Sequence, residues 1–465
     1  MAWHEALVDA RDRDEAAIIV NAFAERNIDI GGVPAEHGGI AYMYARDRIL
    51  ARQQHLGGVE GVRGFQRVED AHRQRGVLDV LREHEVGEVD IRQVARGIVA
   101  VNLSPDRPQR DERDALYLLG QIEEEFGPGL ATLDHVVTTS QGHPTGCPAS
   151  EPQEVYNPEP YPPVCPGNAG HGVRIYVADT GIVRDTVASC PWLEHVEGDD
   201  DPSVLTDGTI LPYGGHGTFV AGVIRCMAPG ADIVVRSVFD IAGSALESDF
   251  VPKLYEGFAY GAEIFHVTVS SPTRFNVPLM AFETWLEDLR RYKGVACVVP
   301  AGNSESPLPH WPAAFPGVIS VGALGSDWRS RAYFSDFGGW VDVYAPGQNL
   351  VNAFATGTFT CHVDPFTGET RTFRGMAQWS GTSFSTPIVT GLIAARMTRH
   401  GENAEAAAAA LLAQARAEAI PGVGPVLLPG CGDDEQRGCC GDEHRHHGCR
   451  CGCHHGGKHG GPWPR

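Results

Sequence analysis

Residues 173–181 read Val173-Arg174-Ile175-Tyr176-Val177-Ala178-Asp179-Thr180-Gly181, an apolar run with one charge that ends in an acidic residue. Such a run predicts a strand buried on both faces, as in a parallel sheet. Active sites of open α/β sheets lie at the carboxyl ends of the strands, which is where Asp179 would stand. Taken alone, Asp-Thr-Gly is more often an ordinary turn after a strand. The run therefore predicts an α/β sheet and offers one candidate catalytic carboxylate.

The stretches that follow alternate strand-like runs with helical patterns. They are Val173 to Ala178, Gly217 to Met227, Ile233 to Val238 and, further on, Val295 to Val299. Strands that alternate with helices predict a mostly parallel sheet with helices on both faces. We therefore expect an α/β domain over residues 171–430.

A histidine opens a helical pattern of small residues in Gly214-Gly215-His216-Gly217-Thr218-Phe219-Val220-Ala221-Gly222-Val223-Ile224. The ordinary pKa of an imidazole, ~6.5, lies near neutral pH, so a neutral ring can take a proton from a hydroxyl and return it. A lone histidine among glycines is more often structural. If Asp179 holds its ring, His216 is a candidate general base.

A serine stands where another buried helix should begin, in Ser380-Gly381-Thr382-Ser383-Phe384-Ser385-Thr386-Pro387-Ile388-Val389-Thr390-Gly391. The amino end of a helix carries partial positive charge, which favours anionic character at Ser383. Gly-Thr-Ser alone is also typical of a helix cap. With the other blocks, it makes Ser383 the candidate nucleophile.

A polar amide lies between the histidine and serine blocks, in Val298-Val299-Pro300-Ala301-Gly302-Asn303-Ser304. The Asn303 side chain would donate one hydrogen bond to an oxyanion, and the Ser383 backbone N–H would donate another. Because asparagine after glycine is common in plain turns, this interpretation depends on the other three residues.

In this order, the four blocks resemble the subtilisin-like serine peptidases, the subtilase family. The resemblance covers roughly Gly172 to Met397 and implies a subtilisin-like three-layer α/β fold. It also implies a serine endopeptidase that hydrolyses peptide bonds through an acyl-enzyme. The resemblance makes Ser383 the nucleophile and His216 the general base and acid. Asp179 then orients the imidazole, and Asn303 lies in the oxyanion hole.

The resemblance extends to the substrate. Val267-Thr268-Val269-Ser270-Ser271-Pro272 resembles the strand that lies along the substrate in the family, with serines in place of its usual glycines. On this basis Ser270, Ala301 and Gly302 are candidate walls of the pocket for the side chain before the scissile bond. The sequence does not place the floor of that pocket.

Three residues near the candidate site depart from the family pattern. Phe219 replaces a frequent second histidine, and Phe384 and Ser385 replace smaller or more flexible apolar residues. Two other functions stay open as alternatives. One is a catalytically silent subtilase-like binding module, and the other is a peptide ligase that uses the same triad and acyl-enzyme.

Residues 1–139 mix strand-like and helical patterns and predict a small α+β unit. Its last stretch, Leu130 to Thr138, resembles the closing strand of a subtilase propeptide. That implies intramolecular inhibition by the N-terminal unit and cleavage near Thr138 to Gly142, whereas an unrelated domain is the alternative. Residues 140–170, rich in proline and glycine, predict a linker or a surface strap.

The cysteines form two groups. Six in the body of the chain are expected to be free thiols, although 15 full pairings are open to them: Cys147, Cys165, Cys190, Cys226, Cys297 and Cys361. The other six lie with many histidines in residues 431–465, a tail that we expect to be disordered and to bind metal without a specific site.

Acidic residues raise the question of calcium. Gly198-Asp199-Asp200-Asp201-Pro202 carries enough carboxylates for calcium, yet a solvated acidic loop is the preferred interpretation. We therefore assign no metal ligand and expect no required cofactor, while calcium stays open without a site.

The composition of the chain disfavours some classes of partner, and its sequence suggests where in the cell it acts. The chain has 465 residues and a formal net charge of -22, which disfavours nucleic acid and anionic membranes as partners and leaves a peptide or protein substrate. No signal peptide or membrane span is visible in the sequence. We therefore expect a cytoplasmic protein by default, with export by another route left open.

Overall fold

The computed structural model describes residues 3–7, 10–35, 39–57, 75–86, 89–103, 113–139, 149–156, 159–239, 242–363 and 365–430. The described residues up to Pro429 belong to one compact unit. The predicted tail, 431–465, lies outside the described residues, so its disorder and its metal binding stay predictions.

A seven-stranded sheet forms the centre of the larger part of the chain, and each neighbouring pair in it is parallel. In spatial order its strands are β14 (Val343–Pro346), β13 (Ile319–Leu324), β12 (Ala296–Pro300), β11 (Ile264–Val267), β6 (Arg174–Asp179), β9 (Asp232–Ser237) and β7 (Glu197–Gly198). From β6 the chain goes to β7 and then β9 on one side, and it later returns to β11 on the other. The carboxyl end of β6 is therefore a switch point, where α/β proteins bind ligands.

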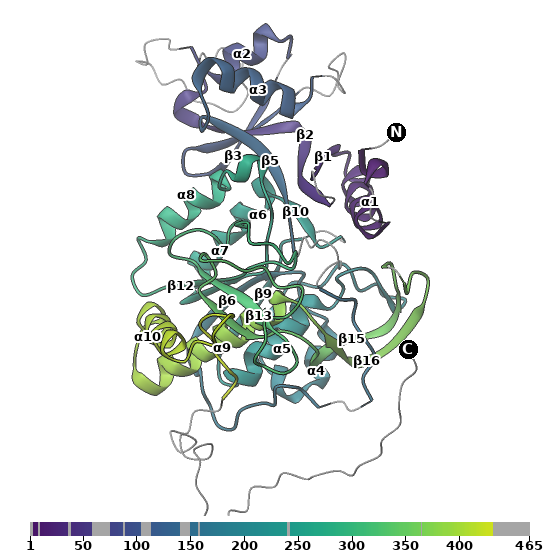
Figure 1. Ribbon diagram of the computed structural model, residues 1–465, viewed down its shortest axis with the longest axis vertical. Helices are drawn as coiled ribbons and strands as arrows, with labels where there is room; N and C mark the ends of the chain where they lie inside the picture. Colours follow the sequence, from purple (N-terminus) through teal and green to yellow (C-terminus); the bar gives the residue numbers. More distant parts are fainter. Residues whose placement is uncertain are drawn as a thin grey trace, which may run out of the picture. The chain divides into compact units, whose positions relative to one another are not determined.

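Helices cover both faces of this sheet, as the sequence predicts (Figure 1). Along β6, Ile175 and Val177 face the core formed with α5 (His216–Met227) and α9 (Thr382–His400). Tyr176 and Ala178 face the opposite core, which includes α6 (Glu247–Leu254) and α8 (Met280–Leu289). The other helices of this part are α4 (Arg184–Ser189), η3 (Pro191–Leu193), α7 (Glu256–Tyr260), η4 (Arg274–Asn276) and α10 (Ala404–Ala417).

The N-terminal part has its own antiparallel sheet of β1 (Ile30–Pro34), β2 (Ile40–Arg52), β3 (Asp90–Ala95), β4 (Ile98–Asn102) and β5 (Ala131–Thr138). Its helices are η1 (Trp3–Ala6), α1 (Ala10–Glu25), η2 (Gln53–His55), α2 (Val77–Glu83) and α3 (Ala115–Phe126). A sixth strand, β10 (Ser244–Leu246), comes from the later part of the chain and pairs antiparallel with β5. The α+β unit thus shares a sheet with the α/β part.

A smaller sheet joins β15 (Leu350–Thr360) and β16 (Thr370–Trp379) with β8 (Thr209–Ile210). The predicted linker follows its strands, because Gln153 bridges to Gln378 and Tyr161 bridges to Val351. At Gln153 and at Tyr161 this segment therefore lies along the small sheet as a strap.

The structure corrects the prediction for one cysteine. Cys226, Cys297 and Cys361 are free and buried, and Cys190 is free and partly exposed. Cys165, in contrast, is disulfide-bonded, so the expectation of a free thiol was wrong there. Cys147 lies outside the described residues.

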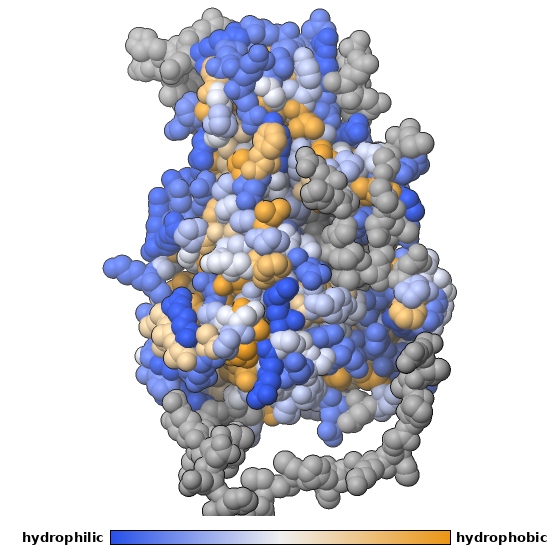
Figure 2. Space-filling model, viewed as in Figure 1, coloured by the Kyte–Doolittle hydropathy of each residue, from blue (hydrophilic) through white to orange (hydrophobic). Residues whose placement is uncertain are grey.

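The face of the molecule in Figure 2 mixes hydrophobic with hydrophilic residues. The most exposed large apolar side chains of the described residues lie in separate segments: Tyr156, Phe275 and Leu308. Such scattered apolar exposure is ordinary for a protein surface and does not mark a binding face.

Candidate active site

Asp179 and His216 meet in the structure as predicted. Asp179 is the last residue of β6, and His216 is the first residue of α5. The distance between Asp179 Oδ1 and His216 Nδ1 is 2.8 Å, and both side chains are fully buried. Since Oδ1 is a carboxylate acceptor, Nδ1 carries the proton, and in the neutral ring Nε2 is left as a proton acceptor.

The Asp179 carboxylate is held in its ionised form by its surroundings. Burial alone would raise its pKa, but the facing His216 and hydrogen bonds from His216, Thr268 and the Thr180 amide bring the pKa below its ordinary value. Thr268 donates its hydroxyl to Oδ2 over 2.6 Å, and the Thr180 N–H donates to Oδ1 over 2.7 Å. The sequence did not single out either threonine.

Aromatic rings enclose the His216 imidazole. Its ring centroid lies 5.2 Å from that of Phe384 and 5.6 Å from that of Trp379. Phe219 in turn packs on Phe384 at 4.5 Å. Phe219 and Phe384, two of the departures from the family pattern, therefore contact each other. Phe384 and Trp379 pack on the imidazole, and Phe219 packs on both of these rings.

Ser383 is the second residue of α9 and is fully buried. Its Oγ donates a hydrogen bond to the backbone carbonyl oxygen of Thr139, 3.2 Å away. The next residue, Phe384, contacts the His216 ring. The structure thus brings the serine block next to the aspartate and histidine blocks and sets a peptide carbonyl against the serine.

Asn303 follows β12 and is fully buried beside the start of α9. Its Oδ1 accepts hydrogen bonds from the Thr382 amide at 2.8 Å and from the Thr382 hydroxyl at 2.9 Å. These two donors fix which way the side-chain amide points. Nδ2 is buried and has no hydrogen-bond partner among the described residues, so it is free to donate to an incoming oxyanion.

The end of β5 is paired along both of its edges. On one side β10 pairs with it, Ser244 opposite Thr138, and Gly243 O accepts from the Thr139 amide over 3.0 Å. On the other side the Ser270 amide donates to Thr138 O over 3.1 Å. Of the three predicted wall residues, Ser270 therefore contacts this chain directly. Backbone pairing on both edges is the way in which an extended peptide adds to a sheet.

Asp201 belongs to the acidic loop but is not solvated, which corrects the prediction for this residue. It is buried and accepts hydrogen bonds from the Thr180 hydroxyl at 2.8 Å, the Gly215 amide at 2.8 Å and the Ser203 amide at 2.9 Å. Burial raises the pKa of its carboxyl to about 6, although these hydrogen bonds oppose the rise. Asp201 thus links the residues that flank Asp179 and His216.

The rest of this loop is engaged with arginines. Asp200 pairs with Arg184, and Asp199 pairs with Arg236 at 2.9 Å. Over the described residues no group of three or more His, Cys, Asp or Glu side chains is placed to hold a metal ion. Calcium therefore stays an untested prediction.

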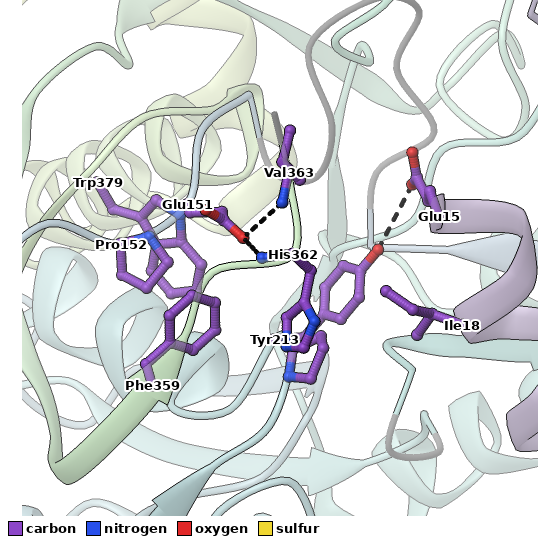
Figure 3. A pocket seen from close by; sticks show the side chains of 10 residues that line it. Glu15, Ile18, Glu151, Pro152, Tyr213, Phe359, His362, Val363 and Trp379 are labelled. Atoms are coloured by element: carbon purple, nitrogen blue, oxygen red, sulfur yellow. Dashed lines mark hydrogen bonds between the residues drawn. The ribbon is translucent and has the colours of Figure 1, made fainter. Parts of the chain in front are cut away.

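A pocket that the sequence does not predict lies beside the aromatic cluster (Figure 3). Trp379 lines it together with Tyr213, three residues before His216, while Glu15 and Ile18 reach it from α1. The Tyr213 hydroxyl lies 3.4 Å from Glu15 Oε1. The N-terminal part therefore contacts the site region at this pocket as well as at the end of β5.

Comparison with known proteins agrees with this geometry. Residues 170–432 match the sequence profile of the subtilase family. The M-protease of Shouchella clausii (strain KSM-K16) is 27% identical over 330 residues, which is 68% of this chain and 73% of that protein. The thermophilic serine proteinase of Bacillus sp. (strain AK1) is 30% identical over 223 residues, or 45% of this chain and 47% of the relative.

A solved structure supports the same fold. Fervidolysin from Fervidobacterium pennivorans, a keratinolytic enzyme related to subtilisin, superposes with a TM-score of 0.52 at 17% sequence identity. The match covers 83% of this chain and 60% of fervidolysin. None of the described helices is long and apolar enough to cross a membrane.

Proposed function

Because the chain belongs to the subtilase family of serine peptidases, we propose that it cleaves peptide bonds with Ser383 as nucleophile, His216 as general base and acid, and Asp179 as the group that orients the imidazole. The substrate is a peptide or protein bound in an extended conformation. One observation carries this proposal: the buried Asp179–His216 pair contacts the ring of Phe384, and the preceding residue, Ser383, has its Oγ hydrogen-bonded to a peptide carbonyl.

The chemistry follows from these positions. Ser383 Oγ forms a bond to the carbonyl carbon while its proton passes to Nε2 of His216, and the carbonyl electron pair moves to oxygen. Asn303 Nδ2 donates a hydrogen bond to this oxyanion. When the C–N bond breaks, His216 returns the proton to the leaving amine. Water then attacks the acyl-enzyme by the same proton transfers.

Two unpaired atoms support these roles. His216 Nε2 and Asn303 Nδ2 are both buried without a hydrogen-bond partner among the described residues. A buried polar atom without a partner costs about 1–3 kcal/mol, so such atoms are expected where a reacting group will pair with them. The unpaired Nε2 supports the role of proton acceptor for His216, and the unpaired Nδ2 supports the role of hydrogen-bond donor for Asn303.

We propose that the chain's own segment is the first substrate. Thr139 O accepts the hydrogen bond from Ser383 Oγ, so the bond that would be cleaved joins Thr139 to Ser140. This lies within the range that the sequence predicts, Thr138 to Gly142. Until the cleaved segment leaves, it fills the place of an external substrate, and the N-terminal unit then acts as an intramolecular inhibitor.

The test is the N-terminus of the purified full-length protein, determined by mass spectrometry. Wild type is expected to begin at Ser140, and Ser383→Ala is expected to keep the original start while retaining the same circular dichroism spectrum. A wild-type protein that keeps its original start, and whose Ser383 also fails to react with a fluorophosphonate, would refute the proposal. Processing of Ser383→Ala at the same bond would assign the cleavage to another enzyme.

Ligation stays an alternative because it uses the same acyl-enzyme. Product analysis separates the two: hydrolysis gives two linear fragments, whereas ligation joins the acyl part to an added amine. A silent binding module would leave Ser383 unlabelled by the fluorophosphonate.

A further inference from the structure

Three polar side chains from separate segments meet beside Ala301 and Gly302. Ser270 Oγ lies 3.2 Å from His310 Nδ1, and His310 Nδ1 lies 3.0 Å from Asp336 Oδ2. Ser270 Oγ also donates to Ala301 O over 3.3 Å. Ser270 and Asp336 are fully buried and His310 is 5% exposed, so this trio is part of the interior.

Asp336 is fixed in place yet keeps one acceptor atom without a donor. Its Oδ1 accepts hydrogen bonds from the amides of Ser304 at 2.8 Å and Ser306 at 2.9 Å. Its Oδ2 is buried, and its contact with His310 lacks hydrogen-bond geometry, so among the described residues it has no hydrogen-bond partner. A buried carboxylate oxygen in this state gains stability from a hydroxyl that reaches it.

The trio of Ser270, His310 and Asp336 lies close to the backbone of Gly302. A Cβ atom added to Gly302 would stand 2.1 Å from Asp336 Oδ2 and 2.8 Å from both His310 Nδ1 and Ser270 Oγ. The trio is therefore packed directly against the Gly302 backbone, one residue before Asn303. Because no side chain separates them, a side chain that comes against Gly302 on this side meets these three groups.

Through Ser270, the trio also lies next to Thr138, the residue before Thr139. The Ser270 amide donates to Thr138 O, and Ser383 Oγ donates to Thr139 O. Over these two residues the chain passes from Ser270 to Ser383. Ser270 therefore contacts this chain through its amide and His310 through its Oγ.

We propose that Ser270, His310 and Asp336 form the floor of the pocket for the side chain before the scissile bond, and that this floor selects threonine or serine there. The proposal rests on the proposed function. A floor this close to Gly302 leaves no depth for a long side chain. A large apolar group over it would also bury a carboxylate without a donor, whereas a short hydroxyl supplies one. The residue at this place in the chain itself is Thr139.

The test uses peptides that differ only in the residue before the scissile bond, which is Thr, Ser, Val, Leu, Phe or Lys. Threonine and valine have nearly the same shape, so their ratio of kcat/KM reports the hydroxyl alone. A hydrogen bond to a charged group predicts that threonine exceeds valine roughly 10- to 100-fold. Leucine, phenylalanine and lysine are expected to be poorer still than valine.

Two substitutions test whether the trio causes the preference for threonine and the exclusion of long side chains. In Asp336→Ser the threonine-to-valine ratio is expected to fall toward one, and His310→Gly is expected to raise the relative rate for leucine and phenylalanine. Asp327→Asn, which changes an exposed carboxylate in a turn, is the control and should leave the ratio unchanged. Fluorophosphonate titration of Ser383 restricts the comparison to active molecules if a variant folds poorly.

The outcomes separate this proposal from the proposed function. Wild-type preference for lysine, leucine or phenylalanine, or a threonine-to-valine ratio that survives Asp336→Ser, would overturn the assigned floor while leaving the peptidase intact. A protein that cleaves none of the peptides and leaves Ser383 unlabelled would refute the proposed function and this assignment with it.

Discussion

The Asn303 side chain depends on a single neighbour for its orientation. Thr382, the residue before the proposed nucleophile, donates both its amide and its hydroxyl to Asn303 Oδ1. The amide group that is left, Nδ2, is therefore aimed by the same turn that places Ser383. An asparagine held in this way donates its hydrogen bond with little reorganisation as charge develops on the substrate.

Replacing this donor should slow the chemical step. We expect Asn303→Ala to lower kcat about 10²- to 10³-fold with a much smaller change in KM, because the hydrogen bond forms in the transition state. Steady-state kinetics on a cleaved peptide measure both constants. The control is Gln414→Ala, which removes an exposed amide on α10. An unchanged kcat in Asn303→Ala would exclude Asn303 from the oxyanion hole.

Some residues of the candidate site can be predicted from the sequence, and others cannot. Asp179, His216 and Ser383 could be named because each stands in a local block with a recognisable order. His310 and Asp336 could not, since they meet only after two loops fold against Gly302. The signal available for them is indirect, because both residues only follow the Asn303 block along the chain.

At the scale of elements, α5 and α9 are locked together at their amino ends by the rings of Phe219 and Phe384. The pair is 4.5 Å apart, and Trp379 of β16 closes the cluster with ring centroids 5.9 Å and 5.1 Å away. Rings this close interact beyond the burial of their area. Two of the three departures from the family pattern, Phe219 and Phe384, thus pack against each other.

The two phenylalanines should therefore show coupled effects on stability. In a Ser383→Ala background, which prevents self-digestion, each Phe→Ala change at 219 or 384 should lower the free energy of unfolding by about 3–5 kcal/mol. The double variant should lose less than the sum, by about 0.5–1.5 kcal/mol. Urea unfolding followed by tryptophan fluorescence measures each value.

Phe23, a fully buried ring of α1, provides the matched control. Because Phe23 and Phe219 belong to different core clusters, Phe23→Ala combined with Phe219→Ala should be additive within about 0.5 kcal/mol. If the Phe219–Phe384 pair were equally additive, the rings would not stabilise each other.

The apolar pattern of the sequence predicts strands β5 and β6, but it does not predict the pairing of β10 with β5. The apolar run before Asp179 and the stretch before Thr138 form strands as expected, β6 and β5. β10 has three residues and no alternating pattern of its own, so its pairing with β5 arises only when the two parts of the chain meet. Short strands of this kind are specified by tertiary contacts.

On the scale of the whole molecule, buried ionisable groups join the N-terminal part to the rest. Asp134 of β5 accepts hydrogen bonds from the Ser248 amide at 3.0 Å and hydroxyl at 2.6 Å, at the start of α6. His135 accepts a hydrogen bond from the Arg274 amide through Nε2 at 3.2 Å. Burial, aided by the positive charge of Arg274, lowers the pKa of His135 to about 3.

The sign of the His135 shift gives a prediction for pH. Because the docked state holds His135 neutral while a released segment has an ordinary pKa near 6.5, docking is supported above pH 6.5. That support is lost as pH falls toward 3. Asp134 and Glu247 act in the opposite sense, since burial raises their pKa to about 6 and about 8. The His135 contribution must therefore be isolated by substitution.

His135→Gln keeps an acceptor for the Arg274 amide and removes the titration. We expect the ratio of wild-type to variant release rates, followed after cleavage as the gain of peptidase activity, to rise roughly tenfold per pH unit below 6.5. His400→Gln, at the exposed end of α9, is the control and should show no such dependence. A ratio independent of pH would show that His135 does not titrate on release.

The central claim is that Ser383 is a nucleophile activated by His216. Its most direct test is mass-spectrometric mapping of the protein after reaction with a fluorophosphonate, once the N-terminal segment has been cleaved. We predict one adduct on Ser383, formed in wild type and lost or strongly slowed in His216→Ala. An adduct on another serine, or a fully folded and cleaved protein with none, would contradict the account.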